Sequence, residues 1–307
     1  TWTEGSMPEG YKLTDTRKNG TVTTLTNTYA PEKVSITGIK TWNDANNQDG
    51  KRPTSIKISL FANGNVVKSL DVTAATNWTY SFTDLPKYEA GTEIKYTVGE
   101  EAVADYETKV EGYNITNTHK PETLDITGTK TWNDSNNQDG KRPKSITVNL
   151  LANGIITDTK TVTADDNWTY SFTDLPKYAN GQEITYTVAE EEVTDYTTTY
   201  DGSNITNSYT PGETSASVTK IWDDADNQDG IRPESITVNL FADGTKLKSQ
   251  SVSTDADGNW SYSFTDLPKY ANGQEITYTV TEDAVDGYTT ESDGYNFINI
   301  HQPETTE

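Results

Sequence analysis

The sequence predicts an all-β fold built from tandem antiparallel β-sandwiches. Three observations carry this prediction: a long internal repeat, short runs rich in Thr, Tyr, Val and Ile that alternate with polar residues, and turn signals between the runs. No segment shows a helical apolar period over a useful length, so helices are not expected.

Two motifs recur along the 307 residues. KTWNDANNQDGKRP and its close variants occupy residues 40–53, 130–143 and 220–233. NWTYSFTDLPKY occurs at 77–88 and 167–178, and as NWSYSFTDLPKY at 259–270, after a two-residue insertion. A spacing of about 90 residues is too long for a solenoid unit and indicates whole small domains.

Joints that contain proline predict the domain boundaries. They are YAPEK (29–33), HKPET (119–123) and YTPGET (209–214). We expect complete repeats at 31–120, 121–211 and 212–307, the last with a short tail. Because TLTNTYAP resembles NITNTHKP, residues 1–30 are interpreted as the C-terminal remnant of a preceding repeat. The short joints favour a semi-extended string of domains within a longer protein.

Each repeat is expected to contain about seven short strands. In the second repeat, TLDITGTKTW is the first strand, and a polar loop with Gly140 and Pro143 follows. SITVNLLA alternates, and Asn153-Gly154 predicts a hairpin turn. The alternation places three apolar residues on one face: Ile146, Val148 and Leu150.

The remaining strands follow the same logic. NWTYSF is expected to place Trp168, Tyr170 and Phe172 on one face of a strand. PKYANG turns the chain, ITYTVAE alternates again, and NITNSY closes the repeat.

The parity of these strands turns three polar residues of each repeat toward the core. Lys130 shares a face with Ile126 and Trp132, although lysine is almost never fully buried without a partner. A glutamate of YTVxE and an asparagine of the last strand also extend apolar faces. The inward residues are Lys40, Lys130 and Lys220; Glu100, Glu190 and Glu282; and Asn117, Asn207 and Asn299.

These three residue types have a joint chemical use. Burial lowers the pKa of lysine and raises that of glutamate, which favours a neutral pair. A neutral amine can attack a carboxamide while a protonated glutamate polarises the carbonyl and moves protons. Ammonia leaves and a Lys–Asn isopeptide bond remains, with proximity supplying much of the acceleration. The reaction happens once per domain, so it is maturation rather than turnover by an enzyme.

The ordered set of motifs resembles the Cna B-type domains of Gram-positive surface adhesins and pilins. The set comprises KTW or KIW, NQDGKRP or NQDGIRP, FTDLPKY, YTVxE and NITNT-like endings, and it covers all three repeats and the remnant. The resemblance implies a transthyretin-like or inverse immunoglobulin-like sandwich whose first and last strands are joined. It implies these bonds: Lys40 to Asn117 assisted by Glu100, Lys130 to Asn207 by Glu190, and Lys220 to Asn299 by Glu282.

The remnant departs from this pattern. Asn27 has no lysine partner there, and Glu4 fits only the glutamate position, so no bond is expected in it. An alternative for the complete repeats is that each inward lysine reaches solvent at a strand end.

Other sites have weak support. NDANNQDG resembles a calcium loop, but Ala45 and Ile56 stand where an EF-hand needs acidic residues, which favours a structured turn. The chain has no cysteine and two histidines, which argues against disulfides, thiol chemistry and a histidine-based metal site. We therefore expect no metal and no cofactor.

Composition and repetition bound the function. A net charge of -23 argues against nucleic acid and anionic membrane as partners, and no stretch is apolar enough for a membrane span. The resemblance implies an extracellular stalk of a bacterial cell-wall-anchored surface protein, whose partners are other domains of the same protein. The alternative is a set of ligand-binding adhesin repeats that contact a host extracellular-matrix protein or glycan. A multiple-turnover enzyme would need a site unique to one repeat, and the sequence contains none.

Overall fold

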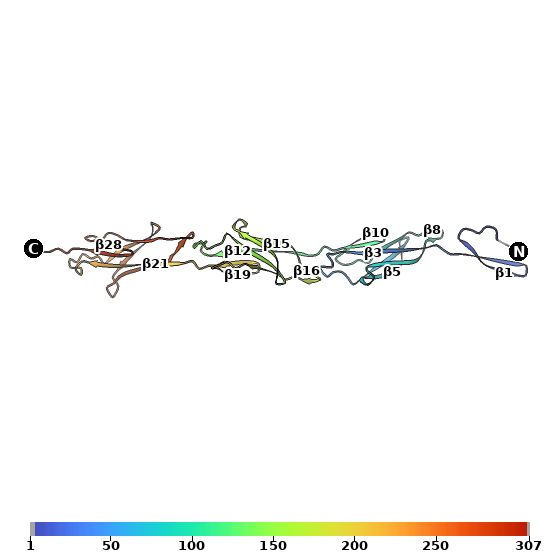
Figure 1. Cartoon of the computed structure of the whole chain (residues 1–307), viewed down its shortest axis with the longest axis horizontal. Helices are drawn as coiled ribbons and strands as arrows, with labels where there is room; N and C mark the ends of the chain where they lie inside the picture. Colours follow the sequence, from blue (N-terminus) through green and yellow to red (C-terminus); the bar gives the residue numbers. More distant parts are fainter. Residues whose placement is uncertain (1–3, 306–307) are drawn as a thin grey trace. The chain divides into compact units, whose positions relative to one another are not determined.

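The computed structural model describes residues 4–305, which form strands connected by turns (Figure 1). Within this range there is no α-helix, only two single 3₁₀ turns, Ala74–Thr76 and Ala164–Asp166. Accordingly, no described helix has the length and apolar character needed to cross a membrane. The remnant contributes one antiparallel hairpin of β1 (Tyr11–Asn19) and β2 (Val22–Tyr29).

The three complete repeats show the same succession of nine strands. The first has β3 (Lys33–Asn43), β4 (Ser55–Ala62), β5 (Asn65–Thr73), β6 (Thr79–Pro86), β7 (Tyr88–Glu89), β8 (Thr92–Glu93), β9 (Tyr96–Glu100), β10 (Glu107–Glu111) and β11 (Asn114–Thr118). The second has β12 (Thr123–Asn133), β13 (Ser145–Ala152), β14 (Ile155–Thr163), β15 (Thr169–Pro176), β16 (Tyr178–Ala179), β17 (Gln182–Glu183), β18 (Tyr186–Glu190), β19 (Thr197–Asp201) and β20 (Asn204–Ser208). The third has β21 (Glu213–Asp223), β22 (Ser235–Ala242), β23 (Thr245–Ser253), β24 (Trp260–Pro268), β25 (Tyr270–Ala271), β26 (Gln274–Glu275), β27 (Tyr278–Glu282), β28 (Thr289–Asp293) and β29 (Asn296–Ile300).

Seven strands of each repeat form two facing sheets, as the sequence predicts. In the first repeat the four-stranded sheet has the order β10-β11-β3-β6 and the three-stranded sheet the order β5-β4-β9. β7 and β8 add a small hairpin. The pairing is antiparallel except between β11 and β3, which are parallel, as are β20 with β12 and β29 with β21. The first and last strands of each repeat are therefore neighbours that run in the same direction.

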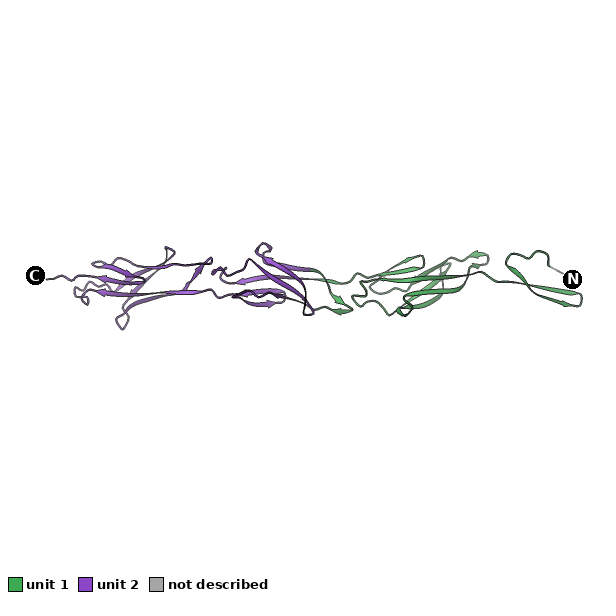
Figure 2. Ribbon diagram, viewed as in Figure 1, with its two compact units in different colours: residues 1–125, 173–184 green, residues 126–172, 185–307 purple. Residues whose placement is uncertain are grey.

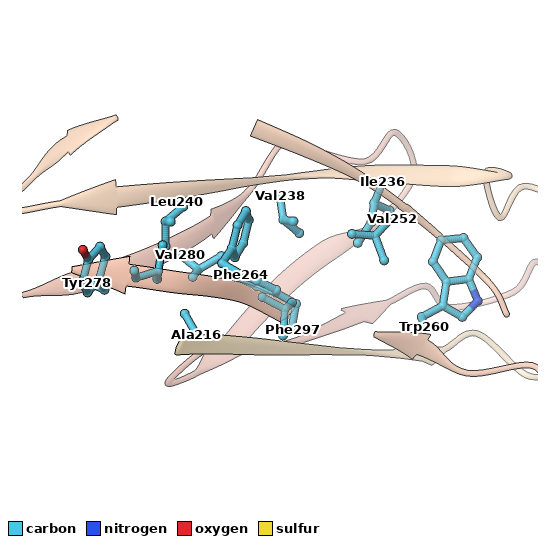
Figure 3. Packing of buried hydrophobic residues seen from close by; sticks show 12 residues of the cluster. Ala216, Ile236, Val238, Leu240, Val252, Trp260, Phe264, Tyr278, Val280 and Phe297 are labelled. Carbon is cyan, nitrogen blue, oxygen red and sulfur yellow. The ribbon is translucent and has the colours of Figure 1, made fainter. Parts of the chain in front are cut away.

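The core lies between the two sheets, and Figure 3 shows it for the third repeat. Val238 and Leu240 of β22 face Phe264 of β24 and Phe297 of β29, and all four side chains are buried. The period of two in SITVNLFA explains this, because alternate residues of a strand share a face. The predicted face of the second repeat is confirmed in the same way, with buried Ile146, Val148 and Leu150.

One prediction about the strand faces is wrong. Tyr170 and Phe172 are buried on β15, but Trp168 precedes that strand and has a φ of 56°. The 3₁₀ turn ends in the left-handed Asn167, and this conformation continues into Trp168 before the strand begins. In the third repeat the two-residue insertion replaces this turn, and Trp260 starts β24 as a buried residue.

The described chain divides into two compact units (Figure 2). One contains residues 1–125 and 173–184, and the other contains residues 126–172 and 185–307. The first unit thus includes the hairpin β16–β17 from the second repeat. The predicted boundaries after residues 30, 120 and 211 stay a prediction.

Gly128 is expected to be essential for the stability of the second repeat. The Tyr170 hydroxyl donates a hydrogen bond to the Ser203 carbonyl beside it, and a Cβ on Gly128 would lie 2.1 Å from that oxygen. Gly128→Ala should therefore destabilise the repeat by about 2–4 kcal/mol, measured by denaturant unfolding. Gly5→Ala is the control, because its Cβ would meet nothing within 4 Å and its φ is not positive. An equal loss in both variants would contradict the steric argument.

Candidate functional site

The parallel first and last strands place the predicted lysine and asparagine on adjacent strands. In the second repeat Lys130 of β12 pairs with Ile205 of β20, and Trp132 pairs with Asn207. Lys130 and Asn207 are therefore diagonal neighbours, a placement from which long side chains can meet. Glu190 ends β18 in the opposite sheet, so the site uses three strands and lies between the sheets.

The structure brings each lysine to its predicted glutamate. All six side chains of these pairs are 0% exposed. The alternative in which the lysines reach solvent is therefore wrong. The distance from Nζ to Oε1 is 2.9, 2.8 and 3.5 Å in the pairs Lys40 with Glu100, Lys130 with Glu190, and Lys220 with Glu282.

The asparagines are equally buried and poorly bonded. Asn117, Asn207 and Asn299 are 0% exposed. The side-chain amides of Asn117 and Asn207 have no hydrogen-bond partner among the described residues. In the third repeat Asn299 Nδ2 donates to Glu282 Oε1 at 3.2 Å, while its Oδ1 accepts nothing. A buried polar group without a hydrogen-bond partner destabilises a fold by about 1–3 kcal/mol. These carboxamides therefore destabilise the folded repeat, and a reaction that consumes them could remove this penalty.

Burial shifts the pKa of all three lysines, and that of Glu282 in the third repeat, toward the neutral form. Burial lowers the pKa of Lys40 and Lys130, although the neighbouring glutamate opposes the shift. For Lys220, burial lowers the pKa to about 8. Burial also raises the pKa of Glu282, against the effect of the nearby Lys220 ammonium. These directions are the ones that an uncharged nucleophile and a proton-carrying acid require.

Two contacts at this site were not predicted from the sequence. Thr198 pairs with Asn207 across β19 and β20, and its hydroxyl donates to Glu190 Oε2 at 3.1 Å. Thr108 and Thr290 make the equivalent contacts at 3.2 and 3.5 Å. The Lys130 Nζ also lies 4.4 Å from the centroid of the Trp132 ring. The sequence feature that could have predicted the threonine contacts is the position of each threonine nine residues before the asparagine. This spacing can be interpreted only once the register of the hairpin is known.

In the remnant, two of the three site positions are occupied by the expected residue types, a glutamate and an asparagine. Asn27 of β2 donates from Nδ2 to Glu4 Oε1 at 2.6 Å. This contact resembles that of Asn299 with Glu282, so the structure supports the assignment of Glu4 to the glutamate position. That no bond forms in the remnant stays a prediction.

The loop that resembles a calcium site is a structured turn, as the sequence favours. The Asp44 carboxylate accepts hydrogen bonds from Arg52 Nε and Nη2 at 3.0 and 2.6 Å, from the Tyr106 hydroxyl at 2.8 Å and from the Asn47 amide at 2.9 Å. The guanidinium thus supplies the positive charge beside this carboxylate. Across residues 4–305, no cluster of three or more His, Cys, Asp or Glu side chains could hold a metal ion.

Acid is expected to weaken this turn in the third repeat. The hydrogen bond from Arg232 holds the pKa of buried Asp224 at about 2, below the usual value near 3.9. Asp224 therefore stabilises the fold fully above about pH 4, and this contribution is lost as the pH falls through about 2. Urea unfolding should show a loss of about 2 kcal/mol over this range that is missing from Asp224→Asn. Equal pH slopes in the two proteins would contradict this.

The fold and the buried site define a class of β-sandwich domain found in surface proteins. The chain belongs to the Cna protein B-type domain family, whose model matches residues 36–118, 126–208 and 216–300. This confirms the family resemblance drawn from the motifs.

Two relatives support the assignment. The chain is 49% identical over 311 residues to a collagen adhesin of Staphylococcus aureus, and the match covers 99% of this chain and 26% of that protein. The chain thus spans about a quarter of the length of this relative. It is 48% identical to the crystal structure of two B repeat units of the collagen binding protein of Staphylococcus aureus, with a TM-score of 0.55, covering 89% of this chain and 74% of that one.

Proposed function

We propose that this chain is part of the stalk of a bacterial cell-wall-anchored surface protein, located outside the cell. It holds an adhesive head away from the wall, and its partners are the other domains of the same protein. Each complete repeat is stabilised by an autocatalytic Lys–Asn isopeptide bond. The observation that carries this proposal is the fully buried lysine, glutamate and asparagine found at the same strand positions in all three repeats.

In the proposed reaction, the neutral Nζ of Lys130 attacks the side-chain carbonyl carbon of Asn207. Protonated Glu190 donates a hydrogen bond to the developing oxyanion and then moves a proton from Nζ to the departing amide nitrogen. The bond from Nζ to Cγ forms, the bond from Cγ to Nδ2 breaks, and ammonia leaves. Thr198 positions the carboxyl group, and the Trp132 ring helps to keep water away from the amine. Each site reacts once, so the chain is not a turnover enzyme.

The position of the bond explains its use in a stalk. It joins β12 to β20, so residues 131–206 lie inside a closed covalent loop. Tension that enters through the first strand leaves through the last without loading the rest of the sandwich. By analogy with a disulfide, closing a loop of this length stabilises the fold by about 4–5 kcal/mol. The chain has no cysteine to provide such a link.

The intact mass of the denatured chain tests this proposal. Three complete repeats should lower the mass by three ammonia molecules relative to the sequence. A mass equal to that of the sequence would overturn the crosslink and the load-bearing role that depends on it.

A second candidate function is direct binding of a host extracellular-matrix protein or glycan by the repeats. The names of the relatives favour it, since one is a collagen adhesin and the other a collagen binding protein. Repeats that bind should gain affinity for immobilised collagen or glycan as their number increases from one to three, through avidity. The stalk proposal expects no such gain.

A further inference from the structure

A histidine ties the connector after the first repeat to two loops of that same repeat. His119 directly follows β11, the last strand. Its Nδ1 lies 2.8 Å from the carbonyl oxygen of Asp105, which precedes β10, and its Nε2 lies 3.0 Å from Oδ2 of Asp49, which follows β3. These residues all belong to one compact unit. The imidazole ring therefore bridges the two loops.

Both neighbours of the imidazole ring are hydrogen-bond acceptors. A carbonyl oxygen and an ionised carboxylate have no proton to offer, so each ring nitrogen has to donate one. A neutral imidazole carries one N–H and satisfies one of the two acceptors, whereas the imidazolium carries two. The geometry thus selects the charged form of His119. In agreement, the hydrogen bond to Asp49 raises the pKa of His119 above the usual value of 6.5.

The Asp49 carboxylate depends on this positive charge. The Asp49 side chain is 0% exposed and that of His119 is 10% exposed. The Asp49 Oδ2 atom that faces His119 also accepts a hydrogen bond from the Glu122 amide at 2.7 Å. A buried carboxylate that loses its cationic partner is strongly unfavourable. Deprotonation of Nε2 would therefore weaken the hold of Asp49 on the connector at Glu122.

The other charged side chains of this region have partners of their own. The Asp105 carboxylate pairs with Lys51 at 3.4 Å. On the connector, the Glu122 carboxylate pairs with Lys177 at 2.9 Å. These pairs leave the His119 ring as the cationic partner that faces Asp49.

A tyrosine ring packs on His119 and keeps its proton near neutral pH. The centroids of the Tyr106 and His119 rings are 5.4 Å apart, and the Tyr106 hydroxyl donates to Asp44 at 2.8 Å. Burial raises the pKa of Tyr106 further above its usual value. His119 is therefore the group of this cluster that changes its charge near physiological pH.

The second repeat makes the same connection with a tyrosine. The Tyr209 hydroxyl donates to Asp139 Oδ2 at 2.9 Å, and the Gly212 amide donates to the same oxygen at 2.8 Å. The Tyr209 ring packs on Tyr196 with 5.5 Å between the centroids, as His119 packs on Tyr106. The hydrogen bond to Asp139 raises the pKa of Tyr209, so its hydroxyl keeps its proton. This connector is held without a group that titrates near neutral pH.

The third repeat returns to histidine. His301 places Nδ1 2.8 Å from the Gly287 carbonyl oxygen and Nε2 2.9 Å from Asp229 Oδ2. The same carboxylate oxygen accepts the Glu304 amide at 3.1 Å. The ring again lies between two acceptors, and these two are the chain's only histidines. Both histidines are thus used in the same way.

We propose that His119 is a proton-operated clamp on the connector after the first repeat. Doubly protonated, it bonds Asp105 and Asp49, and Asp49 in turn holds the Glu122 amide. When the pH rises, Nε2 gives its proton to water, its hydrogen bond to Asp49 is lost and the connector loosens. The connector closed by Tyr209 does not respond. The clamp uses no residue of the buried lysine sites, so it operates whether or not the isopeptide bonds form.

The direction of the pH effect follows from the raised pKa of His119 in the folded repeat. The stabilisation by the clamp is complete below about pH 6.5, the usual pKa of histidine in an unfolded chain. It is lost as the pH rises through the higher pKa of the folded state. The clamp therefore holds in acid and opens in mild alkali.

The protonation of the ring is measured first. In His301→Tyr, which copies the arrangement of Tyr209, His119 is the sole histidine of the full chain. Long-range ¹H–¹⁵N spectra then report both of its ring nitrogens. Both should carry a proton in acid, and the midpoint for loss of one proton should lie above 6.5. A midpoint at or below 6.5 would overturn the proposal.

Hydrogen exchange of the Glu122 amide measures the release of the connector. Its protection, relative to an unfolded chain at the same pH, should fall by about tenfold per pH unit between the unfolded and folded pKa values, because opening is linked to one proton. Protection of the Gly212 amide should stay constant. His119→Tyr should make Glu122 equally constant, and Tyr209→His should transfer the pH dependence to Gly212. Protection of Glu122 that ignores pH, or that falls equally in His119→Tyr, contradicts the clamp.

Discussion

Lys130→Ala is expected to remove one crosslink and to destabilise the second repeat by about 4–5 kcal/mol. The physical reason is that the unfolded second repeat regains the conformational freedom that the closed loop takes away. The intact mass should fall short of the sequence by two ammonia molecules instead of three. A thermal scan should show one repeat unfolding well below the others.

Lys141→Ala is the matched control for this variant. It removes the same charge from the same repeat, but the Lys141 side chain is 50% exposed and pairs with Asp195 at the surface. Such a pair contributes about 0–1 kcal/mol, so the mass deficit and the unfolding temperature should stay close to those of the natural chain. A three-ammonia deficit that persists in Lys130→Ala would show that Lys130 is not the nucleophile.

The extension of the chain under a force applied to its two ends should distinguish the natural protein from Lys130→Ala even more clearly. With the proposed isopeptide bonds in place, the loaded path runs through the covalent bond of each complete repeat, so none of the repeats should lengthen by unfolding. In Lys130→Ala the residues between β12 and β20 are released. Single-molecule force spectroscopy should record one added extension of roughly 25 nm, since an extended residue spans about 3.3–3.6 Å.

Two further variants test whether the added extension comes from loss of the Lys130 crosslink. Lys141→Ala should again behave like the natural chain, and combining Lys130→Ala with Lys220→Ala should give two extension events. Extension events of this length from all three complete repeats of the natural chain would show that the sandwiches themselves bear the load.

Local pattern was enough to predict the strands and the inward polar residues. Alternation in SITVNLLA identified a buried face, and the parity of ITGTKTW turned Lys130 inward. Both inferences succeeded because the side chains of a strand alternate whatever the strand pairs with. The same reasoning failed at Trp168, where a left-handed backbone starts the strand later than the apolar pattern suggests.

The sequence by itself determined which types of polar residue are buried in each repeat: one lysine, one glutamate and one asparagine. Only the tertiary structure decided how they meet. The parallel pairing of β12 with β20, the approach of Glu190 from the opposite sheet and the contact with Thr198 all join segments far apart in the chain. The hydrogen bond from the Gly181 amide to the Gln48 carbonyl is likewise long-range. Such contacts depend on strand register and sheet packing, which local periodicity does not encode.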